Sequence, residues 1–521
     1  MADQPAAKRA RTDSSKDDQR WAPLRHHDGG PGPAAQTTTL RGNLRAALPT
    51  VRETAAITLG LTAAASPAHD WRPSVQHVCA ALAEDSEGAV RHAAALALAA
   101  LGPPPRQPLA EEATLEAEEA TLVRAAQVLA AAVADPDGDV RAAAAKALSS
   151  VLSSPAAAAP LVADAVATLT ALVPGRSEQL APVRQAVLKS LGKLGGQLRA
   201  RAPGERALRP AFGAVVAQLA VEPSADWRTD APGVLAALHC AGDGDAGPDG
   251  AAEDQLVGLL GHAHEGVGRT AAASLVAITQ AGGCAALFGA LSRPLGNGSD
   301  VRLMLAALAV VSEAFGSTQW SFEGGGLWVQ GKEAAAAAAK SEGNAAALAG
   351  LWEHCTACLR YGDGESGLEE EEEESEEAAM AAAVRSAATH AVAALGKRMP
   401  SEERLAALRG VLGSEKALHR ASGLEAVGRL GPAAAATLTG DVLEALTDTD
   451  GNVRWTAAVA AGQVLRVAAE GDSAEAAAVA ALGEEERTSA AAVLQGVMED
   501  EDEEVPVRMV SQPRPADRLL L

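Results

Sequence analysis

One short phrase recurs along the 521 residues of the chain. Its clearest copies read Asp-Pro-Asp-Gly-Asp-Val-Arg at 135–141, Asp-Thr-Asp-Gly-Asn-Val-Arg at 448–454 and Asp-Ser-Glu-Gly-Ala-Val-Arg at 85–91. Weaker copies are Val51-Arg52, Val183-Arg184, Trp227-Arg228, Gly268-Arg269, Val301-Arg302, Val384-Arg385, His419-Arg420 and Val507-Arg508. The arginines follow one another at intervals of about 40 residues, a period typical of a helical solenoid.

The phrase is typical of a tight turn that leads into a helix. Asp, Gly and Asn favour the turn, and a residue such as Asp139, Asp300 or Asn452 then stands where a helix N-cap belongs. The following valine enters the core, and small apolar residues recur three and four positions later, for example at Ala144, Ala147 and Leu148. A second amphipathic segment precedes each turn, so each unit is a helical hairpin that must stack on its neighbours. The valines predicted as core residues are Val90, Val140, Val301 and Val453.

This pattern resembles HEAT-repeat proteins, with armadillo repeats as close cousins. The resemblance covers about residues 38–510 and implies an all-α fold, a right-handed superhelical α-solenoid of stacked HEAT-like hairpins. In such proteins a turn acid and a second-helix arginine form a ladder between repeats. The resemblance therefore assigns pairs to Asp137 with Arg141 and to Asp450 with Arg454, and includes Arg91 and Arg302 in the ladder.

Composition agrees with this fold and limits the partners. Ala is the strongest helix former, and the 48% hydrophobic fraction is sufficient for a core although only 2% of the residues are aromatic. The net charge of −23 argues against direct nucleic-acid binding, because phosphate contacts need clustered Lys and Arg. An acidic solenoid surface instead favours protein partners, including basic ones. No uncharged run reaches the roughly 18 residues needed to cross a membrane.

The sequence divides at two interruptions. We predict a disordered tail over 1–37, repeats over 38–314, an aromatic and Gly-rich insertion with an Ala-rich spacer helix over 315–345, further repeats over 346–510, and a C-terminal tail over 511–521. Trp320, Phe322 and Trp328 lie in the first insertion and are candidate partner-binding residues, although they equally fit a gap between helices. A run of glutamates makes 362–377 an acidic, solvated insertion or a docking strip for a basic tail.

The N-terminal tail contains a short basic cluster, Lys8, Arg9 and Arg11. It resembles a nuclear import signal, and it equally fits a solvated tail with a chance basic cluster. Five scattered cysteines indicate a reducing interior rather than a disulfide framework. We therefore expect a nuclear or cytoplasmic protein.

Catalytic motifs are weak. Cys355 and Cys358 have a Cys-x-x-Cys spacing but lack a second cysteine pair to complete a zinc site, and their amphipathic surroundings favour core packing. Deoxyhypusine hydroxylase, a repeat-built di-iron enzyme, needs several His-Glu pairs, whereas this chain has only His264-Glu265. We therefore predict no cofactor, no metal and no catalysis.

The sequence predicts a non-enzymatic protein–protein interaction scaffold or adaptor that works as a subunit of a larger complex. The alternatives are an importin-beta-like nuclear transport receptor and, less favoured, a repeat-built metalloenzyme.

Overall fold

The computed structural model describes residues 33–65, 72–101, 112–154, 157–173, 180–202, 207–239, 250–282, 285–297, 300–316, 342–362, 376–396, 402–430 and 437–469. Within these ranges the secondary structure is helical and contains no strand. The chain divides into two compact units, the first comprising Met1–Gln218 with Glu222–Cys240 and the second Leu219–Val221 with Ala241–Leu521.

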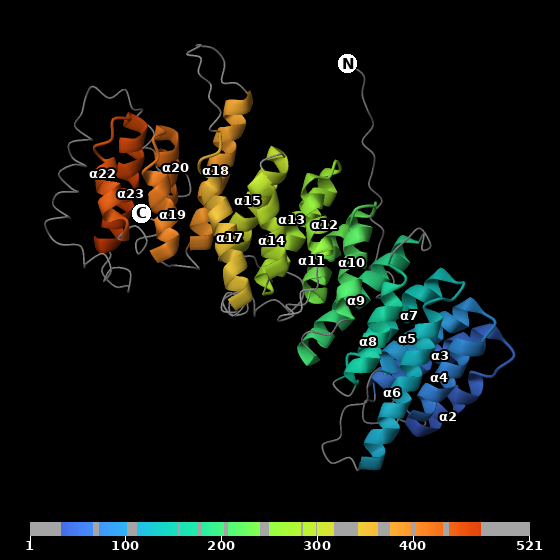
Figure 1. The fold of residues 1–521 in the computed structure, drawn as a ribbon. Coiled ribbons are helices and arrows are strands. Elements are labelled where there is room, and N and C mark those ends of the chain that lie inside the picture. Colours follow the sequence, from blue (N-terminus) through green and yellow to red (C-terminus); the bar gives the residue numbers. More distant parts are fainter. Residues whose placement is uncertain are drawn as a thin grey trace, which may run out of the picture. The chain divides into compact units, whose positions relative to one another are not determined.

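The described helices form antiparallel hairpins in chain order (Figure 1). In the first unit the pairs are α2 (Pro33–Asn43) with α3 (Pro49–Ala65), α4 (Arg72–Glu84) with α5 (Gly88–Leu101), α6 (Glu112–Ala132) with α7 (Gly138–Val151), α8 (Ala159–Thr170) with α9 (Ala181–Arg201), and α10 (Leu208–Leu219) with α11 (Ala225–Leu238). In the second unit they are α12 (Ala251–Gly258) and the short 3-10 helix η1 (Leu259–Gly261) with α13 (Glu265–Gln280), α14 (Ala285–Asn297) with α15 (Val301–Gly316), α17 (Glu342–Cys358) with α18 (Glu376–Gly396), α19 (Glu402–Leu412) with α20 (Ala417–Leu430), and α22 (Thr439–Ala445) with α23 (Gly451–Ala469).

The hairpins stack so that first helices contact first helices and second helices contact second helices. We call the first helix of each pair the A helix and the second the B helix. In the first unit α3, α5, α7, α9 and α11 pack in succession as a B layer, and in the second unit α13, α15, α18, α20 and α23 do the same (Figure 1). The predicted α-solenoid is therefore confirmed within each unit, whereas the right-handed superhelix stays a prediction.

The beginning of α7 shows how the recurring phrase makes a B helix. Asp137 has extended backbone angles and its carboxylate accepts the amide of Asp139, which satisfies one of the unpaired amides of the first turn. Val140 then stands at the third helical position and is fully buried. The buried stripe continues through Ala144 and Leu148, so the helix presents one apolar face to its neighbours.

The same third position is buried in other B helices, whichever residue occupies it. The occupants are Val90, Val140, Val183, Trp227, Val267, His419 and Val453. Trp227 and His419 thus take the place of valine in α11 and α20, the B helices of the two hairpins whose boundaries are least evident from the sequence.

The observed caps differ from the predicted ones in two of three helices. Asp137 rather than Asp139 caps α7, and Asp450 rather than Asn452 accepts the Val453 amide in α23. Asp300 caps α15 as predicted.

Val301, however, is not the predicted core residue. Helix α15 begins at Val301 itself, because the Asp300 carboxylate accepts the amides of Arg302 and Leu303. Val301 therefore stands in the first helical position, where it is only half-buried, and Met304 is buried in the core instead. The Val-Arg dipeptide is present at this site, but its distance from the cap differs by two residues from that in α7.

One helix segment, Ala378–Gly396, is long and apolar enough to cross a membrane by length and composition. Half of it is buried inside the protein, and it packs against α15, α17 and α20. Val384, Ala388 and Leu395 are buried in these contacts, which identifies the segment as a core helix of the second unit.

Candidate functional site

The most regular polar feature of the molecule is a set of arginines at the fourth position of the B helices. The Arg91 guanidinium forms two parallel bonds to the Asp135 carboxylate of the next hairpin, with Nε–Oδ2 at 2.7 Å and Nη2–Oδ1 at 2.9 Å. The same bidentate arrangement joins Arg52 to Asp85, Arg184 to Glu222 and Arg420 to Asp448. Both side chains of each pair are largely buried, so these contacts tie successive repeats together.

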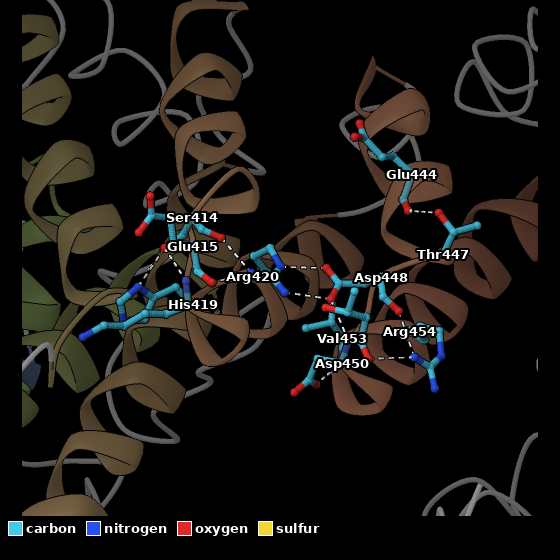
Figure 2. A network of polar contacts seen from close by, with 12 residues as sticks. Ser414, Glu415, His419, Arg420, Glu444, Thr447, Asp448, Asp450, Val453 and Arg454 are labelled. Atoms are coloured by element: carbon cyan, nitrogen blue, oxygen red, sulfur yellow. Dashed lines mark hydrogen bonds and ion pairs between the residues drawn. The ribbon is translucent and has the colours of Figure 1, made fainter. Parts of the chain in front are cut away.

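Arg52, Arg91 and Arg420 also close the turn that precedes their own helix. In Arg91 the third nitrogen, Nη1, donates to the carbonyls of Asp85 and Ser86 at 2.9 and 3.0 Å. In Figure 2, Arg420 bonds to the carbonyls of Ser414 and Glu415 on one side and to the Asp448 carboxylate on the other. One guanidinium therefore fixes a turn and its neighbouring repeat at the same time.

The acid of each pair has a second partner as well. Asp135 Oδ1 accepts the amide of Asp137 at 2.8 Å, and Asp448 Oδ1 accepts the amide of Asp450 at 2.9 Å. The hydrogen bond from Arg91 lowers the pKa of Asp135 more than burial raises it, and Arg420 does the same for Asp448. These carboxylates are thus held in their charged form.

Glu222 is also held in its charged form, although burial opposes this more strongly than it does for the aspartates. Burial raises its pKa, but hydrogen bonds from Arg184, Gln218 and the Ser224 amide outweigh burial, so the pKa lies below its usual value. The longer glutamate therefore performs the role of the turn aspartate in this hairpin.

The observed pairing differs from the one the resemblance implied. Asp137 and Asp450 were expected to pair with Arg141 and Arg454, yet their carboxylates accept the helix-capping amides of Asp139 and Val453. An N-cap carboxylate is directed at its own first turn, so the acid that meets the arginine of the preceding repeat lies two residues earlier.

Arg141 and Arg454 do occupy the ladder position. Their Nη1 atoms donate to the carbonyls of the residues five and six positions earlier, as in Arg91. A sequence signal for the true acid existed, since an acid stands six residues before Arg91, Arg141, Arg228 and Arg454 alike.

Arg302 is not part of the ladder geometry. Because α15 begins at Val301, Arg302 stands at the second helical position and is exposed. Gly268 occupies the ladder position in α13, and the neighbouring Arg269 forms an exposed ion pair with Glu265 of its own helix. The ladder is therefore interrupted at the first hairpins of the second unit.

The cysteine pair of α17 lies in the core. Cys355 and Cys358 are buried, and burial raises the pKa of both thiols, to about 11 for Cys358. The Cys358 Sγ lies 3.9 Å from the Met304 Sδ atom. Thiols in this state are poor nucleophiles and poor metal ligands.

The histidines of the α13 turn have structural partners. Nδ1 of His262 accepts the amide of His264, and Nδ1 of His264 accepts the amide of Gly266, in place of the aspartates of other turns. Within the described ranges no group of three or more His, Cys, Asp or Glu side chains is arranged to hold a metal ion.

Several predicted site residues lie outside the described residues. They are the aromatic candidates Trp320, Phe322 and Trp328, the basic cluster Lys8, Arg9 and Arg11, and most of the acidic insertion at 362–377. Their roles, and the domain boundaries drawn at 315–345, stay predictions.

The structure adds exposed side chains that the sequence analysis did not select. Trp455 and Val459 lie one turn apart on α23 with 37% and 40% of their surface exposed. Lys146 on α7 and Lys189 and Lys193 on α9 are also exposed. Val459, Lys146 and Lys189 each stand five residues after the ladder arginine of their own helix, and Trp455 stands one residue after Arg454. These exposed positions of the B helices can therefore be found in the sequence by counting from the ladder arginine.

Compared with known proteins, the chain matches no protein-family profile and no curated sequence. Solved structures do match. An engineered protein is 19% identical with a TM-score of 0.37, over 82% of this chain and 99% of that one. Kap121p bound to Ste12p is 14% identical with a TM-score of 0.44, over 91% of this chain and 45% of that one. Kap121p bound to Nup53p is 14% identical with a TM-score of 0.38, over 90% and 46%.

The chain thus spans less than half the length of Kap121p. Its class follows from its own helices: A and B layers of stacked hairpins, with the arginine ladder between repeats, define a helical-repeat protein of the α-solenoid type.

Proposed function

We propose that this chain is a HEAT-repeat protein that acts as a non-enzymatic protein–protein interaction scaffold. The observation that supports the proposal is the B layer, in which hairpin after hairpin presents the same outward positions. A surface of this kind offers a partner many weak contacts in a row rather than one deep pocket.

The polar groups of the turns support the same proposal. The buried arginines and carboxylates of the turns bind one another or the backbone, as Arg184 and Glu222 do, and so serve the stacking of repeats. Exposed apolar side chains also remain on the B helices. Trp455 and Val459 form an exposed apolar pair on α23, and Trp is enriched among the residues that dominate the binding energy of protein interfaces.

Partner capture with the full chain tests the proposal. Affinity purification from the source cell, followed by mass spectrometry, should recover at least one protein in near-stoichiometric amount. Trp455→Asp with Val459→Asp should remove or reduce partners that use α23. Leu418→Asp, at an exposed apolar residue in the first turn of α20, is the matched control and should leave recovery unchanged.

The opposite outcome is equally clear. Purified protein that captures no partner and carries iron or zinc near stoichiometry would contradict the scaffold and favour the metalloenzyme. Binding of a small GTPase that releases a captured partner would favour the importin-beta-like receptor over a static scaffold.

A further inference from the structure

Two B helices of the first unit, α7 and α9, carry only basic charged side chains beyond their first turns, opposite in sign to the net charge of −23 of the whole chain. Beyond their first turns, α5, α7 and α9 contain no Asp or Glu. Their exposed charged side chains in this part are lysines, at positions 146, 189 and 193. Exposed acids of the same unit include Glu84 of α4, Glu119 of α6 and Asp164 of α8 on the A helices, and Asp139 of α7 and Asp226 of α11 in the first turns of B helices.

Lys146 and Lys189 lie at the same level of the layer, and Lys193 lies one turn further along α9. Ser190 Oγ of α9 donates to the Ala145 carbonyl of α7 at 2.8 Å, a buried bond that fixes the two helices side by side. Lys146 and Lys189 are the sequence neighbours of these two residues, and Lys193 follows Lys189 by one helical turn. We call Lys146, Lys189 and Lys193 the lysine strip.

The strip is only partly neutralised by the protein. Lys189 Nζ lies 3.2 Å from Asp230 Oδ2 of α11, and Gln185 Nε2 donates to the same oxygen at 3.0 Å. The Lys189 side chain is still 56% exposed. Among the described residues no carboxylate lies within ion-pair distance of Lys146 or Lys193. Burial lowers the pKa of Lys193, so its ammonium group has lost hydration that a carboxylate could replace.

We propose that the lysine strip is a docking surface for an acidic, extended segment of a partner protein, which crosses α7 and α9 toward α11. The proposal rests on the scaffold function and assigns a chemistry to one of its partners. Net charge predicted a basic partner, whereas the local charge of this face favours an acidic one. A strip of three lysines suits a short row of carboxylates, and it is too small for the broad cationic surface that nucleic acid requires.

Fluorescence anisotropy with a labelled hexaglutamate peptide tests the strip on the full-length protein. Each exposed ion pair contributes up to about 1 kcal/mol, a factor of about 5 in affinity. Reversal of all three charges, Lys146→Glu with Lys189→Glu and Lys193→Glu, should therefore weaken binding by roughly tenfold or more. Arg45→Glu, at an exposed cation between α2 and α3, should change it by less than about twofold.

Salt dependence, a folding control and a second variant complete the test. The binding of the wild-type protein should weaken as salt increases, and circular dichroism should show the triple variant folded. If the triple variant unfolds, Lys146→Gln with Lys193→Gln leaves the Lys189–Asp230 pair intact and should still weaken binding. Peptide binding that is absent, or that ignores both sets of variants, would overturn the proposal.

A short labelled DNA duplex separates the other class of ligand. Strip-dependent binding of the duplex without binding of the peptide would overturn the proposal in favour of nucleic acid. The scaffold function fails separately, in the purification that recovers no partner, so the two results are distinguishable.

Discussion

At the residue scale, a single guanidinium such as that of Arg91 joins its own turn to the next repeat. Arg91 binds two carbonyls of its own turn and both oxygens of Asp135 in the next repeat. Five donors in a rigid planar group make this possible, and lysine has no equivalent geometry. Asp135 in turn accepts the Asp137 amide, so loss of either side chain loosens a turn and a repeat contact together.

Asp135→Asn tests the charge of this pair. Asn retains an oxygen for the Asp137 amide but loses the charge. We therefore expect the free energy of unfolding to fall by about 1–2 kcal/mol at pH 7. Because pairing lowers the folded-state pKa of Asp135, its contribution is present above the unfolded value of about 4 and is lost as pH falls through the folded value. Urea unfolding should therefore show a difference at pH 7 that shrinks as the pH falls below about 4 and through the folded-state pKa of Asp135.

The control for this change is Asp139→Asn, an exposed acid in the first turn of α7. It removes the same charge without a repeat contact. An equal loss in both variants, or a difference from wild type that does not depend on pH, would contradict the assigned pair.

Val140→Asp tests the buried third position. Val140 is fully buried, so the variant places an unpaired carboxylate in the core and should lower the free energy of unfolding by more than about 2 kcal/mol. Val221→Asp, at a valine that is 72% exposed, should have little effect in the same urea melts. Comparable stability of the two variants would show that the register of α7 is wrong.

At the element scale, small residues let the B helices approach closely enough to compensate for an Ala-rich core. Each Ala removes little apolar surface from water, so many short contacts must replace a few large ones. A Cβ atom added to Gly192 of α9 would lie 2.7 Å from Val234 Cγ2 of α11 and 3.4 Å from its Cα. Gly60 of α3 is similarly close to Ala97 of α5.

Two glycines of α9 give a matched pair of substitutions. Gly192→Ala should destabilise the protein by about 1 kcal/mol or more, because its methyl group meets Val234. Gly196→Ala places its methyl group 4.0 Å from the nearest atom, the Ala237 Cβ, and should stabilise the helix by about 0.5–1 kcal/mol. Thermal melts compare the two, and stabilisation by both would mean that α9 and α11 are not in close contact.

At the scale of the whole molecule, the two units are held together internally by different means. Of the four bidentate pairs found in the described part of the chain, those of Arg52, Arg91 and Arg184 belong to the first unit. In the second unit Gly268 and Met304 occupy the ladder position of α13 and α15, so these hairpins lack a ladder arginine and are joined by apolar packing and by the Arg293–Asp254 ion pair between α14 and α12. Within each unit successive hairpins contact one another, and stability in such arrays is a sum of local terms.

This organisation predicts that damage stays local. Val140→Asp should increase amide hydrogen exchange in peptides from α5, α7 and α9, which are the mutated helix and its B-layer neighbours. Peptides from α20 and α23 should exchange as in the wild type. Mass spectrometry of the exchanged protein measures both, and a uniform increase along the chain would contradict nearest-neighbour stability.

The sequence by itself determined the hairpins, the buried third position at Val90, Val140 and Val453, and the place of Arg91, Arg141 and Arg454. These features repeat with a fixed local spacing, and helix period and turn chemistry act over a few residues. Asp300 is a cap as predicted, but Val301 directly follows it and is only half-buried, whereas in α7 the cap is Asp137, three residues before Val140.

An acid six residues before the ladder arginine recurs in the sequence, but tertiary structure decided which arginine it meets and which side chains share a surface. Asp135 and Asp137 are both turn acids, and Asp135 is the one that lies within hydrogen-bond distance of Arg91 of the preceding hairpin. The lysine strip likewise exists only because α7 and α9 lie side by side, which brings Lys146 close to residues more than 40 positions away. Contacts between hairpins depend on how the repeats stack, and the local spacing of residues does not specify that stacking.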